Sequence, residues 1–220
     1  MPSEPLVRWP WVTAHLDEIG AALEQHVELT VIAVVAGLAI SFVLALVAHR
    51  YRRAEAPITW VAGVVYTIPS LALFVLLIPV TGLSTLTSEI GLVGYTLLIL
   101  IRNILAGLDG VPEEVLEAAD GMGLTRLQRL LRVELPIALP VITAGIRIAT
   151  VTTIGLVTVT ALIGQGGLGQ LMLAGFINLF PTQIYVGAIL SVALAVLADA
   201  SLLLAQRALT PWARTRGGGS

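Results

Sequence analysis

The sequence predicts an all-α integral membrane protein with five transmembrane helices, its N-terminus outside the cell and its C-terminus inside. Hydrophobic residues make up 57% of the chain, charged residues make up 12%, and the mean hydropathy is +0.94. Soluble domains contain about 25% charged residues. Five apolar segments reach or approach the length of about 20 residues that a helix needs to cross a bilayer. They cover residues 29–48, 58–80, 90–105, 137–163 and 184–204, within a transmembrane domain at 29–206.

The placement of arginine orients these spans, because basic residues concentrate in cytoplasmic loops. The loops at 81–89 and 164–183 contain no basic residue. Ten of the twelve basic residues lie on the opposite side, at the ends of spans one, three and five or in the segments that follow: Arg50, Arg52, Arg53, Arg102, Arg126, Arg129, Arg132, Arg207, Arg214 and Arg216. We therefore expect these segments to be cytoplasmic.

The two ends of the chain differ from the apolar centre. Residues 1–28 are expected to form an extracytoplasmic tail with an amphipathic helix on the outer membrane face, leading into span one. Its apolar residues recur at helical spacing: Val12, Leu16, Ile19, Leu23 and Val27. Residues 207–220 are expected to be a cytoplasmic tail, and its final GGGS has the composition of a flexible linker.

The composition excludes several kinds of chemistry. The chain has no cysteine, and its twelve basic residues are all arginine. It therefore lacks the lysine of a P-loop and cannot hydrolyse ATP by that route. His15, His26 and His49 never pair as H-x-x-x-H, so we expect no metal site. We also expect no catalytic residue, no cofactor on this chain and no nucleic-acid partner.

The segment IGQGGLGQ at 163–170 matches the G-x-G-x-x-G pattern of dinucleotide-binding turns through Gly164, Gly166 and Gly169. Such a turn follows a strand and has an acidic residue about 20 positions further on. Here an apolar span precedes the glycines, and position 189 is Ile. We expect instead that these glycines, with Gly167, end span four, act as an outer turn or gate, and lead into a short interfacial segment at 168–180.

The loop at 106–136 is the most informative cytoplasmic segment. Pro112, Glu113 and Glu114 suit the start of a helix, and Thr125 with Gln128 forms a capping box that starts a second one. We expect two short amphipathic helices at an angle, interrupted by glycines at 121 and 123 and ended by Pro136. An ordinary connector lying on the inner leaflet is the alternative interpretation.

One motif in this loop resembles the EAA motif (E-A-A-x3-G-x9-I-x-L-P) of binding-protein-dependent ABC importer permeases. The matching residues are Glu117, Ala118, Ala119, Gly123, Leu135 and Pro136, and Val133 stands where the motif has Ile. The resemblance implies the type I ABC importer permease fold, in which this loop docks into a separate ATPase subunit. Apolar contacts are then expected from Leu116, Ala118 and Ala119, and polar contacts from Glu117, Arg126, Arg129 and Arg132.

Further segments at 67–79, 102–112 and 134–171 resemble permeases for glycine betaine, choline, carnitine and related osmoprotectants, although residues 156–160 depart from the pattern. The resemblance implies location in a bacterial plasma membrane. It also implies several partners: two ATPase subunits that bind the ATP and Mg²⁺, a second copy or a paralogous permease, and a separate solute-binding protein. A permease for methionine or another amino acid, an ATP-independent secondary transporter and an intramembrane enzyme are the alternatives.

Charged and polar residues inside the spans are candidates for a translocation pathway. Arg147 and Asp199 both fall in the cytoplasmic half of the membrane, and we expect an ion pair between them; the alternative is that Arg147 reaches the inner interface. Pro69 and Ser70 indicate either a kink in span two or a tolerated proline. Five residues share a face of span four, as a pathway lining or a helix contact: Thr143, Arg147, Thr150, Thr153 and Thr160.

Overall fold

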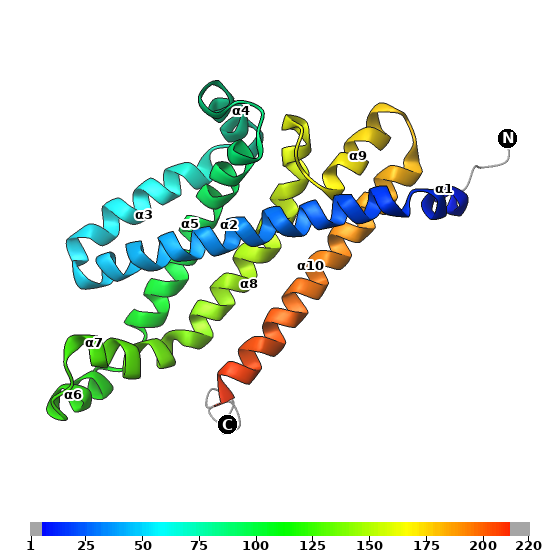
Figure 1. Ribbon diagram of the computed structural model, residues 1–220. Coiled ribbons are helices and arrows are strands. Elements are labelled where there is room, and N and C mark those ends of the chain that lie inside the picture. The colour runs from blue at the N-terminus through cyan, green and yellow to red at the C-terminus, as the bar shows by residue number, and fades with distance from the viewer. Residues whose placement is uncertain (1–5, 212–220) are drawn as a thin grey trace.

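The computed structural model describes residues 6–211, which form helices and connecting turns and no strand (Figure 1). Residues 1–5 and 212–220, with Arg214, Arg216 and the GGGS end, lie outside the described part. The elements are α1 Trp9–Ala14, α2 Leu16–Arg50, α3 Arg52–Thr67, α4 Ser70–Thr81, α5 Thr85–Asp109, α6 Glu113–Gly121, α7 Arg126–Arg129, the π-helical turn η1 Leu130–Glu134, α8 Leu135–Val159, the 3-10 turn η2 Thr160–Ile163, α9 Leu168–Ile177 and α10 Pro181–Leu209.

Four of the described helical segments are long and apolar enough to cross a membrane: α2, α5, the continuous run from α7 to η2, and α10. The bent pair α3 and α4 makes a fifth if it is counted as one span. Figure 1 shows α6 and α7 at the same end of the molecule as the end of α10, whereas α4 and α9 lie at the other end. The arginine-rich loop at 106–136 and the arginine-free loops at 81–89 and 164–183 therefore lie at opposite ends of the molecule (Figure 1).

The expected amphipathic tail helix does not end where span one begins. Residues from Leu16 onward belong to α2, a single helix of 35 residues, and only Val12 lies in the separate helix α1. Ile19 is buried against Leu168 and Leu171 of α9. Because this apolar face continues into the span with no helix-breaking residue, the position 28/29 is not a helix boundary.

Span two is sharply bent rather than straight. The axes of α3 and α4 meet at 98°, and Ile68 between them is extended, with φ −66° and ψ 130°. Proline disfavours the helical conformation in the residue before it, and Pro69 follows Ile68 directly. The hydroxyl of Tyr95 donates to the freed carbonyl of Ile68. The kink is therefore present, and the alternative of a tolerated proline is wrong.

The core lies where α5 packs against α2 and α8. Ile101, Ile104 and Leu108 of α5 are buried together with alanines of α2 and α8. Small residues allow the helix backbones to approach: a Cβ added at Gly37 of α2 would lie 1.9 Å from the hydroxyl oxygen of Thr96. By contrast, α10 buries little of its surface within the described chain.

The glycine-rich segment ends the fourth span, as expected. Gly164, Gly166 and Gly167 have φ values of 83°, 125° and 50°, a region that favours glycine, and α9 follows directly. Gly169 is helical, but a Cβ there would lie 2.4 Å from the carbonyl oxygen of Thr158. The Gly167 N–H donates to the side chain of Gln25 at 3.0 Å, so α2 holds this turn in place.

Candidate functional site

The helices α6 and α7 form an arm that projects beyond the spans (Figure 1). Pro112 is the N-cap of α6, and Glu113 and Glu114 occupy its first turn, where carboxylates interact favourably with the helix dipole. The predicted capping box starts α7: the Gln128 N–H donates to the Thr125 hydroxyl at 3.4 Å, and the Thr125 N–H donates to the Gln128 side chain at 2.9 Å.

The glycine of the motif ends α6 in a defined turn. Gly123 has φ 77°, and its N–H donates to the Asp120 carbonyl at 2.9 Å, while the Leu124 N–H donates to the Ala119 carbonyl at 3.2 Å. This is the hydrogen-bond pattern of a Schellman motif, which requires a left-handed residue at the position of Gly123. Gly121 is still helical, so of the two glycines only Gly123 breaks the helix.

Pro136 does not end the second helix of the arm, contrary to expectation. The chain continues from α7 through η1 into α8, and the Leu135 N–H reaches back five residues to the Leu130 carbonyl. Proline lacks an N–H and crowds the carbonyl four residues earlier in an α-helix. The wider π turn lies directly before Pro136 and relieves this conflict, so the arm joins the fourth span without a loop.

The motif residues differ in exposure. Glu117, Ala118, Gly123 and Arg126 are exposed, and Glu117 has no polar contact within residues 6–211. Ala119 is only 1% exposed and therefore supports the arm from within instead of forming part of its surface. Leu135 and Pro136 are half-buried at the start of α8. Large apolar side chains are exposed beside the motif: Met122, Leu127 and Leu131.

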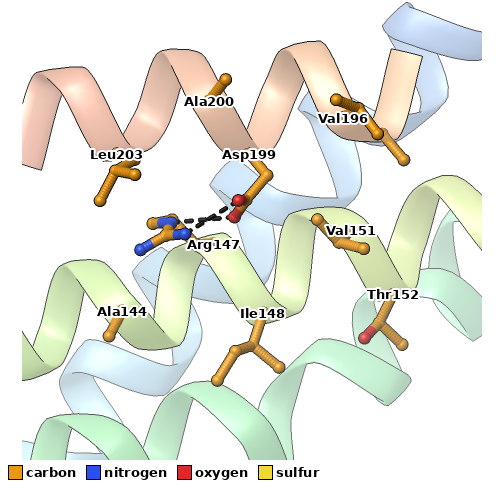
Figure 2. Close-up of a pocket in the computed structure, with 10 residues that line it drawn as sticks. Ala144, Arg147, Ile148, Val151, Thr152, Val196, Asp199, Ala200 and Leu203 are labelled. Carbon is orange, nitrogen blue, oxygen red and sulfur yellow. Dashed lines mark hydrogen bonds and ion pairs between the residues drawn. The ribbon is translucent and has the colours of Figure 1, made fainter. Parts of the chain in front are cut away.

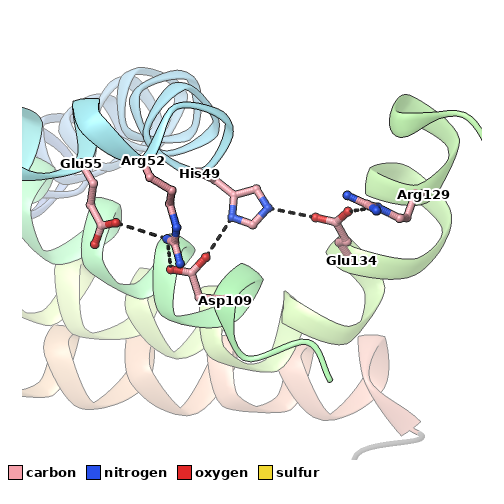
Figure 3. Close-up of polar contacts among 6 residues, drawn as sticks. All are labelled: His49, Arg52, Glu55, Asp109, Arg129 and Glu134. Atoms are coloured by element: carbon pink, nitrogen blue, oxygen red, sulfur yellow. Dashed lines mark hydrogen bonds and ion pairs between the residues drawn. The ribbon is translucent and has the colours of Figure 1, made fainter. Parts of the chain in front are cut away.

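A chain of charged side chains fixes the base of the arm (Figure 3). His49, at the end of α2, lies between two carboxylates: its Nδ1 is 2.9 Å from Asp109 of α5, and its Nε2 is 3.1 Å from Glu134 of η1. Arg129 of α7 donates to Glu134 through Nε at 2.8 Å and to Asp120 of α6 through Nη1 at 2.7 Å. The ends of two spans are thereby linked to both helices of the arm.

The same chain extends to α3, where Arg52 contacts Asp109 at 2.7 Å and Glu55 at 3.2 Å. Sequence reasoning missed this network. It treated Arg129 as a docking residue, whereas Arg129 is bound within the chain to two carboxylates. The available signal was Glu134, an acidic residue next to the start of an apolar span, which requires a partner when it is buried; its side chain is only 4% exposed.

The predicted ion pair between Arg147 and Asp199 is confirmed (Figure 2). Arg147 Nε donates to Asp199 Oδ1 at 2.9 Å and its Nη2 to Oδ2 at 2.8 Å, so the guanidinium binds the carboxylate with two parallel hydrogen bonds. The pair lies in a groove of about 670 Å³ between α8 and α10. Arg147 is therefore paired within the chain. The alternative, in which it extends to the inner membrane interface, is wrong.

None of the four threonines predicted to share a face of span four lines this groove, whereas Thr152, outside that predicted set, does. Thr150, Thr153 and Thr160 are buried within the described chain. The hydroxyls of Thr143, Thr150 and Thr160 donate to carbonyls of the preceding helical turn, at 2.8 Å each. Burial favours helix packing over a pathway lining for Thr150, Thr153 and Thr160, and the Thr153 hydroxyl has no hydrogen-bond partner within residues 6–211. Pro69 is exposed and Ser70 is half-buried, both at the bend of span two. Residues 6–211 contain no cluster of three or more metal-ligating side chains.

Known proteins similar to this chain are transport permeases. The choline transport system permease protein OpuBB of Bacillus subtilis is 36% identical over 85% of this chain and 86% of its own length. The osmoprotectant import permease protein OsmW of Salmonella typhimurium is 38% identical over 85% of this chain and 89% of its own length. The glycine betaine/carnitine/choline transport system permease protein OpuCB of Bacillus subtilis is 34% identical over 85% and 86%.

Solved structures of ABC transporters share the fold. A chain of the inward-facing MetNI methionine ABC transporter superposes with a TM-score of 0.78 over 90% of this chain and 98% of its own, at 23% identity. A chain of an amino acid ABC transporter with histidines superposes with a TM-score of 0.73 over 91% of this chain and 98% of its own length, at 18% identity. Residues 29–215 match the family described as binding-protein-dependent transport system inner membrane component. Together with the arm and its motif, this match shows that the chain is a membrane-integral member of that family, whose members are permease subunits of ABC importers.

Proposed function

We propose that this chain is the permease subunit of an ATP-driven bacterial importer for osmoprotectants of the glycine betaine, choline and carnitine type. The observation that carries the proposal is the exposed motif surface around Glu117 on a helical arm that is continuous with a membrane span. The names of the relatives, which transport these quaternary amines at 34–38% identity, support the substrate class. The chain performs no covalent chemistry, and ATP is hydrolysed on a separate subunit.

The assembly we propose contains two permease subunits, identical or paralogous, with the arms in the cytoplasm and the central pathway between the subunits. Two ATPase subunits with bound ATP and Mg²⁺ dock on the arms, and a separate solute-binding protein delivers the substrate from outside in the bacterial plasma membrane. An exposed amphipathic helix that fits a partner's groove is a common mode of protein recognition. Here Glu117 and Arg126 supply charge beside the apolar Met122 and Leu127.

The pathway is proposed to include the groove at Arg147 on the cytoplasmic side, the bend at Pro69 and Ser70, and the glycine turn at 164–169 as an outer gate. Closure of the two ATPases upon ATP binding moves the arms together and changes the side from which the pathway is open. Thr143, half-buried and next in sequence to Ala144 of the groove, is included in the proposed lining, whereas the buried threonines act in packing.

The test is ATP-dependent uptake in proteoliposomes that contain the permease, its ATPase and its binding protein. Wild type is expected to import glycine betaine or choline only when ATP is enclosed in the liposome lumen, on the same side of the membrane as the ATPase. Glu117→Arg is expected to abolish uptake and to release the ATPase during purification, while Glu113→Arg, at the start of the same helix but outside the motif, serves as a control for added charge. Uptake that continues without ATP or ATPase contradicts the proposal.

A further inference from the structure

The groove between α8 and α10 combines a single pair of opposite charges with apolar walls. Of the ten residues that line it, only Arg147 and Asp199 carry charge. Figure 2 shows the two side chains pointing toward each other from facing helices, with Val151 and Val196 to one side and Leu203 to the other. A small polar solute that enters this groove therefore meets one cation and one anion side by side.

The ion pair leaves part of each group available. Arg147 uses Nε and one hydrogen of Nη2 for Asp199, while Nη1 has only a contact of 3.5 Å to the Gln206 side chain. A guanidinium has five N–H donors in one plane, so the Nη1–Nη2 edge can still bind a second carboxylate. The Asp199 side chain is 39% exposed and the Arg147 side chain 24%. A ligand can thus contact both charges without breaking their mutual hydrogen bonds.

The exposure of the two charged side chains, rather than the apolar walls around them, argues against a groove that faces lipid. Charged side chains within membrane helices are costly in contact with hydrocarbon and normally face the protein interior or a water-filled cavity. The pair lies within the helices of two membrane spans, yet 24% of the Arg147 side chain and 39% of the Asp199 side chain are uncovered within the chain. The groove therefore belongs on the side of the molecule that faces water or a second subunit.

We propose that Arg147 and Asp199 form a binding subsite for a zwitterionic quaternary amine, an assignment that rests on the proposed function. The free edge of Arg147 binds the carboxylate of the solute. Its trimethylammonium group lies against Asp199, with its methyl groups on Val151 and Val196. A quaternary nitrogen has no N–H, so its attraction to Asp199 is electrostatic and leaves the hydrogen bonds of the ion pair in place. A cation without a carboxylate, such as choline, uses Asp199 alone.

This division of roles predicts a selective effect that a purely structural ion pair does not produce. Binding is measured by saturation-transfer NMR on the purified complex of permease and ATPase subunits, without binding protein, with glycine betaine and choline as probes. For Arg147→Gln we expect glycine betaine to bind roughly ten-fold or more weakly, the range for one lost charge-assisted interaction, while choline binding changes less than about two-fold. Asp199→Asn is expected to weaken both probes.

Because either neutral variant leaves one charge unpaired, Arg147→Lys serves as a second variant that keeps the charge but loses the planar fork. It is expected to weaken glycine betaine several-fold and to spare choline. Arg53→Gln, an exposed arginine outside the groove, is the matched control. Equal loss of both probes in Arg147→Gln and Arg147→Lys overturns the subsite, as does the absence of any signal with wild type that still imports glycine betaine. Wild type without ATP-driven uptake of either amine overturns the proposed function instead.

Discussion

His49 Nε2 lies 3.1 Å from Glu134 Oε2, which joins the end of α2 to the π turn that carries the arm. The other ring nitrogen faces Asp109 of α5 at 2.9 Å. Each ring nitrogen of His49 therefore faces one carboxylate oxygen. One side chain thereby connects two membrane helices to the base of the arm.

Replacing His49 is expected to uncouple the arm from the spans. In His49→Ala both carboxylates lose their contact with the imidazole ring, and we expect ATP hydrolysis by the assembled complex to continue while the amount of substrate imported per ATP falls several-fold. The measurement is uptake and phosphate release in the same proteoliposomes. His15→Ala, at the junction of α1 and α2 at the opposite end of the helix, is the control. An unchanged import-to-ATP ratio in His49→Ala contradicts the connecting role.

Arg129 and Arg126 are three residues apart, and their substitution is expected to have opposite consequences. Arg129→Gln removes the charged partner of the buried Glu134, and we expect a loss of about 1.5–3 kcal/mol in stability, the usual range for hydrogen bonds to charged groups. Arg126→Gln changes an exposed side chain and is expected to leave the thermal midpoint unchanged but to weaken ATPase binding. Thermal unfolding measures stability, and pull-down with the ATPase measures docking. A stability loss in Arg126→Gln together with weakened ATPase binding but unchanged stability in Arg129→Gln contradicts these two roles.

The two glycines at the end of α6 provide a matched comparison. Neither has an atom within 4 Å of an added Cβ, but only Gly123 has a positive φ, of 77°. Gly123→Ala is therefore expected to cost about 1–2 kcal/mol, the penalty of a left-handed alanine. Gly121→Ala is expected to be neutral or stabilising by up to about 1 kcal/mol, because alanine favours helices. ATPase binding and thermal stability are measured for both, and equal behaviour contradicts the turn described above.

A second glycine pair tests the contact between α2 and α5. An added Cβ at Gly37 would lie 1.9 Å from the Thr96 hydroxyl oxygen, whereas Gly63 of α3 has open space around it. Gly37→Ala is expected to destabilise the protein by about 1–3 kcal/mol through overpacking, and Gly63→Ala to have little effect. Thermal unfolding in detergent gives the comparison. The double variant Gly37→Ala/Thr96→Ala, which removes the clashing hydroxyl, is expected to recover much of the loss.

The sequence predicted the elements more reliably than the contacts between them. Apolar length located the spans, and the spacing of Glu117, Gly123 and Pro136 located the arm, because these features are local. The continuity of α7 with α8 was missed, because a proline ordinarily ends a helix and no local sequence feature indicates a π turn. Ala119 was assigned to the docking surface because helical spacing does not show which face the neighbouring turn covers.

The network of His49, Asp109 and Glu134 was missed for a different reason. Its members are separated by 60 and 85 residues from His49 along the chain, and no periodic pattern relates them. The ion pair of Arg147 and Asp199 was predictable because charges within apolar spans are few, so each has few candidate partners. Rare charges are informative inside a membrane, whereas common charges near its surface are not.

From Arg126 to Ile163 the chain forms one helical run of 38 residues, about 57 Å long at 1.5 Å per residue. Arg147 lies within this run, and the glycine turn follows its last residue. In the proposed mechanism, a tilt of the arm is therefore passed along this run to the groove at Arg147 and to the glycine turn. In that mechanism, docking of the ATPase and opening of the pathway act on the same helical element, and separating the two events requires a break in that helix.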